Sequence, residues 1–368
     1  MPMRLPDTEP DRIPALDGLR GAAILMVIFW HYSGPSGNWF PGWQGVDLFF
    51  VLSGYLITGR LAGTKGLPGY FSRFYRNRAL RILPLYYAVV AFYMVMVHFF
   101  VRTIHYPAMS LYFTHWKSFF LFTENWTFIS SGVPRDISLV PLWSVAVEAH
   151  FYLLWPLLVL LTTPASRLKI LPALIAVVLV GRAIAASLYP QPFETIYFNS
   201  FFRLDCFCAG ALVYDMHACK VQIPIKWVKA AALLLAGVEI AGLLAARSAS
   251  PGSFFSFGGY TVSALLFACL LHMTAQGRRG ILVRILRQPS LRFCGKISYC
   301  LYLVHIPILL NIGPRFNFLW PVSWSLNKAY LPWPSVVICL AMSFTVSVIS
   351  YRYFESFFLR LKRARPQP

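Results

Sequence analysis

The stretch that decides the fold reads LRGAAILMVIFWHY, from Leu19 to Tyr32, and it places Arg20 and His31 eleven residues apart. Eleven residues are close to three helical turns, so both side chains lie on one face of a helix, roughly 16 Å apart along its axis. A guanidinium and an imidazole on the same stripe of an apolar helix are costly in lipid, and such residues normally face a water-filled cavity or a partner. The stretch therefore predicts a membrane helix with one functional face.

The rest of the composition agrees with a membrane protein. The chain has 368 residues, of which 58% are hydrophobic and only 12% are charged, and this excludes an ordinary soluble domain. We predict an all-α, polytopic helix bundle with about ten spans, near residues 14–33, 46–60, 82–101, 142–162, 170–189, 201–216, 228–246, 257–276, 297–312 and 334–354. Residues 118–128 are apolar enough for a re-entrant segment. The predicted organisation is a cytoplasmic tail at 1–13, a membrane domain at 14–358 and a basic cytoplasmic tail at 359–368.

The distribution of charge predicts topology rather than nucleic-acid binding. The net charge is +20, but with a cytoplasmic N-terminus 23 of the 33 Lys and Arg residues fall on the inner side of the predicted spans. That bias is typical of a multi-pass protein of the plasma membrane, here a bacterial inner membrane, with both termini in the cytoplasm. The seven cysteines lie mostly in spans or inner loops, so we predict neither a disulfide framework nor a metal site.

Two carboxylates enter the predicted bundle from the outer side. Asp47 begins the second span and Glu148 lies inside the fourth, and both are at a depth similar to that of His31. Either could orient the imidazole, and histidine is the side chain best suited to take a proton from a hydroxyl near neutral pH. A plainer interpretation of Asp47, as a helix N-terminal carboxylate, stays open.

Two arginines mark the inner end of the third span. Arg78 and Arg81 are spaced i, i+3 at the boundary of an apolar run, so they share a face and could clamp an anion such as a phosphate. Anionic lipid headgroups would satisfy them equally well.

The remaining polar residues of the spans suit structural roles. We expect Asp17 beside Arg20, Arg203 and Asp205 paired with each other or with neighbours, and Arg352 paired with Glu355. His305, in the ninth span, is expected to be a hydrogen-bonded packing residue.

In their order these segments resemble the membrane-bound acyltransferase-3 family, which includes bacterial O-acetyltransferases for lipopolysaccharide, exopolysaccharide, peptidoglycan and antibiotic sugars. The resemblance covers nearly the whole chain. It is carried by LDGLRG at 16–21 with His31, residues 45–54, RALRILP at 78–84, LWS at 142–144 with Glu148, RLD at 203–205 with Gly210, and SY at 298–299 with His305.

The resemblance implies a ten-span bundle that moves an acyl group, most simply acetyl, from cytoplasmic acyl-CoA to a hydroxyl of an extracytoplasmic or lipid-linked glycan. Acyl-CoA would be a donor substrate rather than a resident cofactor. By the resemblance Arg20 and His31 are essential, and Arg78 and Arg81 bind acyl-CoA. Glu148 matches the glutamate of the family's Trp-Ser segment.

For His31 we expect a general base, with direct transfer or an acyl-histidine relay both open. The chain departs from the family pattern at two places. Ala149 and His150 follow Glu148 where the family usually has an acidic residue and then Gln, and Ser356 follows Glu355 where the family usually has proline. Either departure could alter the choice of acceptor. The alternative class is a transporter or flippase for an anionic solute or lipid-linked sugar.

Overall fold

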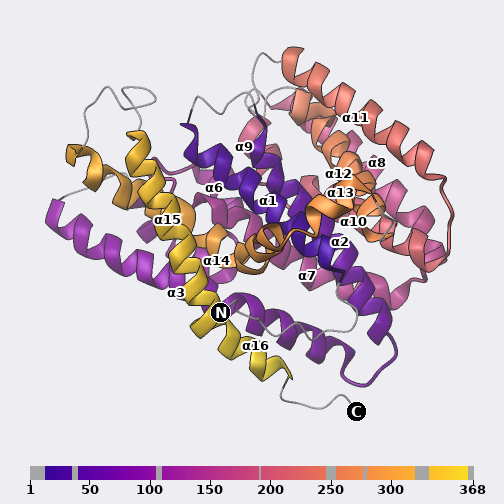
Figure 1. Ribbon diagram of the computed structural model, residues 1–368, viewed down its shortest axis with the longest axis horizontal. Helices are drawn as coiled ribbons and strands as arrows, with labels where there is room; N and C mark the ends of the chain where they lie inside the picture. Colours follow the sequence, from indigo (N-terminus) through magenta and orange to yellow (C-terminus); the bar gives the residue numbers. More distant parts are fainter. Residues whose placement is uncertain are drawn as a thin grey trace.

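The computed structural model describes residues 13–34, 40–104, 110–189, 192–245, 254–276, 280–319 and 331–363. These residues form helices and no β-strand element, which confirms the predicted all-α class (Figure 1). Eight of the described helices, several with short 3-10 or π extensions, are long and apolar enough to cross a membrane. They are α2 (Gly45–Thr64), α3 (Tyr70–Ile104), α7 (Trp143–Leu161), α8 (Pro164–Leu188), α11 (Ile225–Ala245), α12 (Tyr260–Ala275), α14 (Pro289–Ile312) and α15 (Trp333–Ile349).

Shorter elements join these helices or extend them. The α-helical ones are α4 (Ser110–Thr114), α5 (Trp116–Leu121), α6 (Glu124–Ser131), α9 (Pro192–Tyr197), α13 (Ile281–Leu286) and α16 (Ser356–Arg363). The 3-10 helices are η2 (Gly42–Gln44), η4 (Val140–Leu142), η5 (Phe201–Arg203) and η7 (Gly313–Leu319), and the π-helices are η6 (Phe255–Gly259) and η9 (Ser350–Glu355). The predicted re-entrant segment at 118–128 is instead split between α5 and α6, because Phe122 between them has a left-handed backbone with φ of 57°.

Two of the ten predicted spans do not reach the length or hydropathy of the other eight. These are α1 (Pro14–Tyr32), which carries Asp17, Arg20 and His31, and α10 (Leu204–Ala218), which has only 15 residues. Both are enclosed by neighbouring helices: α1 packs along α14 and α2, and α10 packs along α2, α8 and α12 (Figure 1). These two less apolar helices therefore pack among the other helices of the bundle.

Glycines allow these inner helices to touch backbone to backbone. A Cβ atom added at Gly210 of α10 would lie 1.8 Å from the Val51 carbonyl oxygen of α2, and one at Gly295 of α14 would lie 1.9 Å from the Asp17 carbonyl oxygen of α1. Small residues at helix crossings are the usual means of close packing in membranes. These close contacts fix the position of α2 relative to α10 and of α14 relative to α1.

Gly210→Ala is expected to lower stability by about 1–3 kcal/mol, because the added methyl group must push α10 away from α2. The matched control is Gly237→Ala in α11, where an added Cβ atom meets no atom within 4 Å. Thermal unfolding of both variants in detergent measures the difference. Equal melting temperatures would show that the α2–α10 contact is not tight.

Three fully buried arginines tie helices together through carboxylates. Arg167 donates to Asp215 from Nε and Nη2, at 2.8 and 2.5 Å. Arg182 pairs with Asp205 at 2.7 Å, and Arg203 pairs with Asp47. The prediction for Arg203 and Asp205 is confirmed in its second form, because each residue pairs with a neighbour and not with the other.

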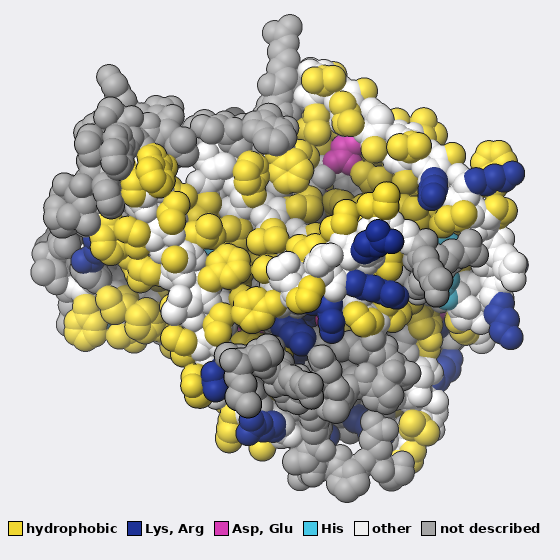
Figure 2. Space-filling model, viewed as in Figure 1, with side chains coloured by type: hydrophobic (Ala, Val, Ile, Leu, Met, Phe, Trp, Pro, Cys, Tyr) yellow, Lys and Arg dark blue, Asp and Glu magenta, His cyan; other side chains and the backbone are white. Residues whose placement is uncertain are grey.

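Apolar side chains dominate the outside of the bundle. Leu233 and Leu244 of the peripheral helix α11 are 76% and 74% exposed, as expected of a lipid-facing surface. Figure 2 shows hydrophobic side chains over much of one face, with Lys and Arg gathered toward its lower and right-hand parts. This separation is what a helix bundle in a bilayer requires. The predicted sidedness of the termini stays a prediction.

Candidate functional site

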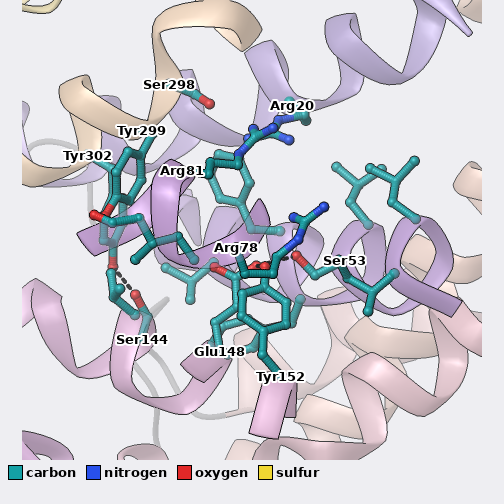
Figure 3. Close-up of a pocket in the computed structure, with 18 residues that line it drawn as sticks. Arg20, Ser53, Arg78, Arg81, Ser144, Glu148, Tyr152, Ser298, Tyr299 and Tyr302 are labelled. Atoms are coloured by element: carbon teal, nitrogen blue, oxygen red, sulfur yellow. Dashed lines mark hydrogen bonds between the residues drawn. The ribbon is translucent and has the colours of Figure 1, made fainter. Parts of the chain in front are cut away.

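One cavity lies between α1, α2, α3, α7 and α14. Its volume is about 810 Å³, counting its open mouth. Four of the six predicted site residues contribute to its wall, namely Arg20, Arg78, Arg81 and Glu148 (Figure 3). The remaining lining is apolar or hydroxylated and comprises Val46, Phe49, Phe50, Leu52, Ser53, Leu56, Ile57, Ile82, Ser144, Val145, Tyr152, Ser298, Tyr299 and Tyr302.

Three guanidinium groups converge on this cavity from two helices. Arg20 comes from α1, whereas Arg78 and Arg81 come from α3, which begins at Tyr70 rather than at the predicted residue 82 and so carries the arginines within one continuous helix. The Nε atoms of Arg20 and Arg78 are buried without a hydrogen-bond partner. The Arg78 guanidinium lies 5.6 Å from the Tyr152 ring centroid, which helps to fix its direction. Buried N–H donors of this kind call for an anionic ligand.

Glu148 is the carboxylate of the cavity and is held by two hydroxyl groups. Ser53 of α2 and Tyr152 of α7 both donate to its Oε1 atom. Its charge acts on Arg20 and Arg78. The prediction that Glu148 orients His31 is therefore wrong, because the carboxylate is turned toward the guanidinium groups instead.

Asp47 is also not a partner of His31. It lies in the first turn of α2 and faces α10, where it forms a fully buried ion pair with Arg203. The Arg203 guanidinium in turn stacks over the Tyr260 ring at 4.1 Å. Asp47 is thus part of a structural tie between α2, α10 and α12, which corrects its predicted place in the site.

His31 instead contacts a second histidine, His305 of α14. The His305 Nε2 atom lies 3.2 Å from His31 Nδ1, and the two ring centroids are 5.0 Å apart. His305 was expected to be a packing residue only. Apart from an imidazole in the middle of an apolar helix, no signal in the sequence connected it with a histidine 274 positions away.

The hydrogen bonds of the pair determine its tautomers. His305 Nδ1 faces the Tyr302 carbonyl oxygen at 2.7 Å, and His31 Nδ1 faces the Val27 carbonyl oxygen at 3.0 Å. A carbonyl only accepts, so both Nδ1 atoms carry the proton in the neutral rings. His305 Nε2 is then a second acceptor, which shares the single His31 Nδ1 proton with the Val27 carbonyl oxygen, and His31 Nε2 keeps a lone pair. This arrangement gives His31 the form that a general base needs.

Tyr302 separates the cavity from the two histidines. Its side chain lines the cavity, while its ring centroid lies 5.7 Å from that of His305. Its hydroxyl donates to the Pro141 carbonyl oxygen at 2.9 Å and bonds Ser144 Oγ at 2.6 Å (Figure 3). His31 is not among the residues that line the cavity. Of the two residues on the predicted functional face of α1, Arg20 therefore lines the cavity and His31 does not.

His305→Ala is expected to lower kcat of the acyl transfer that the family resemblance implies about 10- to 100-fold with little change in KM, because it removes one of the two acceptors that hold the His31 ring. His305→Gln places a carbonyl oxygen near the former Nε2 atom and should restore part of kcat. Steady-state kinetics of both variants test this. A rise in KM alone, or no rescue by glutamine, would contradict the positioning role.

Comparison with known proteins gives one family and several relatives. A family model described as an acyltransferase domain matches residues 13–352. The peptidoglycan O-acetyltransferase OatA of Listeria monocytogenes is 27% identical over 94% of this chain and 55% of its own length. The O-acetyltransferase OatA of Staphylococcus aureus is 27% identical over 95% and 57%, and YrhL of Bacillus subtilis is 31% identical over 93% and 54%. The chain thus spans about half the length of these relatives. No solved structure matches it.

Proposed function

The chain belongs to the acyltransferase family whose model covers residues 13–352, and on this premise we propose that it is an integral membrane O-acetyltransferase. It takes the acetyl group from cytoplasmic acetyl-CoA and delivers it to a hydroxyl of an extracytoplasmic or lipid-linked glycan. All three relatives are named as O-acetyltransferases, and the names of OatA from Listeria and of YrhL, the latter as putative, specify peptidoglycan; this supports the acetyl group and a cell-envelope glycan.

The guanidinium groups that line the cavity carry the proposal for the donor. A coenzyme A thioester has several phosphate charges at one end and an uncharged acyl group at the other. Arg78 and Arg81, one helical turn apart on α3, form charge-assisted hydrogen bonds to the phosphates. The apolar lining from α2, including Phe50 and Leu52, accommodates the uncharged pantetheine arm.

In this proposal His31 supplies the chemistry and Arg20 helps to hold the donor. His31 Nε2 takes the proton of the acceptor hydroxyl as its oxygen attacks the thioester carbonyl carbon. The C–S bond then breaks, an ester forms, and the proton passes from His31 to the departing thiolate of coenzyme A. Arg20, whose Nε atom has no partner, binds the anionic part of the donor together with Arg78 and Arg81. Tyr302 must turn aside for the acyl group to reach the histidine pair.

Transfer of label from donor to glycan tests the function. Membranes with and without the chain are given acetyl-CoA radiolabelled in the acetyl group, and peptidoglycan, lipopolysaccharide and lipid-linked sugar fractions are counted separately. Chain-dependent label that mild base releases as acetate supports an O-acetyl ester and identifies the acceptor class. Flux of an anionic solute or lipid-linked sugar without label in any fraction would favour the transporter alternative.

A further inference from the structure

A second hollow meets the cavity at Arg81. This groove lies between α3 and the last helical segment, η9 with α16, and its volume is about 190 Å³ when the open space at its mouth is counted. It is lined by Leu80, Arg81, Pro84, Leu85, Phe354, Glu355, Phe358 and Leu359. Among the residues that the structure describes, Arg81 is the one that lines both hollows, and Glu355 is the one acidic residue of the groove.

Glu355 does not form the ion pair with Arg352 that the i, i+3 spacing of the two residues predicts. Its expected partner Arg352 lies over the Tyr353 ring at 5.4 Å. The Glu355 carboxylate has a long 3.4 Å hydrogen bond from Ser350 and lines the same groove as Arg81. The π-helical turn Ser350–Glu355 that carries it is a local widening of the kind often found at functional sites.

We propose that Glu355 is the counter-ion of Arg81 in the empty site and that it competes with the donor phosphates for this guanidinium. The proposal rests on the proposed function, in which Arg81 binds an anion. A carboxylate beside the clamp weakens every anionic ligand of Arg81, including spent coenzyme A, and so favours release of the product. Glu355 thus keeps the affinity for the donor below the value that Arg81 would give without a neighbouring carboxylate.

Binding of coenzyme A to the purified full chain in nanodiscs tests the proposal by calorimetry at low salt. Glu355→Gln is expected to lower the Kd about three- to tenfold, which corresponds to roughly 0.7–1.4 kcal/mol. In an Arg81→Gln background the same substitution should change the Kd much less, because the guanidinium for which Glu355 competes is absent. Higher salt should shrink the difference between wild type and Glu355→Gln.

Two controls separate charge from shape. Glu355→Asp keeps the charge and should bind coenzyme A much as the wild type does, and Glu355→Ser serves as a second neutral variant if Glu355→Gln does not fold. Pantetheine, which has no phosphate, should bind wild type and Glu355→Gln equally.

The outcomes distinguish this inference from the proposed function. Unchanged or weaker coenzyme A binding in the neutral variants, or tightening that persists without Arg81, would overturn the role of Glu355 alone. A wild-type chain that binds no coenzyme A would instead overturn the proposed function.

Discussion

His31→Ala is expected to lower the rate of acyl transfer roughly 10²- to 10⁴-fold, the range typical of a lost general base. The physical reason is the lone pair on His31 Nε2, which the hydrogen bonds of His31 Nδ1 and of His305 leave free for a proton. The measurement is initial transfer of labelled acetyl groups in membranes, normalised to the amount of inserted protein.

The matched control is His217→Gln. His217 of α10 also forms an imidazole pair, with His272 of α12 at 3.0 Å, but it lies outside the cavity lining. This variant should transfer acetyl groups at close to the wild-type rate. Activity of His31→Ala within a few fold of wild type would remove His31 from the chemistry. A loss of equal size in His217→Gln would show that the assay reports folding.

Joint replacement of Arg78 and Arg81 by glutamine is expected to lower kcat/KM for acetyl-CoA about 10²- to 10⁴-fold. Each charge-assisted hydrogen bond to a phosphate contributes about 1.5–3 kcal/mol, so the loss of two gives this range. The loss should appear mainly in KM, because the phosphates lie away from the reacting carbonyl and bind alike before and during reaction. Steady-state kinetics with varied acetyl-CoA provides the measurement.

The control for charge at this end of α3 is Arg73→Gln. Arg73 donates to the Pro68 carbonyl oxygen at 3.0 Å and does not line the cavity, so its loss should leave kcat/KM nearly unchanged. S-acetylpantetheine, which has no phosphate, offers a second check, because the double variant should use it as well as the wild type does. A double variant with an unaltered KM for acetyl-CoA would contradict the clamp.

The helical fold could be predicted from the sequence because lipid imposes a simple rule. A segment in the bilayer core must satisfy its own backbone and expose apolar side chains, so hydropathy marks eight of the ten predicted spans correctly. The rule is weaker for α1 and α10, whose sides are covered by other helices and which therefore tolerate charge or short length.

The candidate site was predictable only in part, because pairing between helices depends on rotation about each axis. The spacing of Arg78 and Arg81 fixes their common face, and both line the cavity. Depth along the membrane, in contrast, suggested Asp47 and Glu148 as partners of His31, although depth does not say which neighbour a side chain faces. Packing of α2 against α10 turns Asp47 toward Arg203, and packing of α1 against α14 brings His305 to His31.

A structure of the full chain in a lipid nanodisc with coenzyme A, obtained by electron cryo-microscopy, tests the central claim most directly. The account predicts phosphate density against Arg78 and Arg81, with the thiol end of the ligand inside the cavity and directed toward Tyr302 and the His31–His305 pair. Coenzyme A bound elsewhere, with the three guanidinium groups occupied by lipid headgroups or left empty, would contradict it.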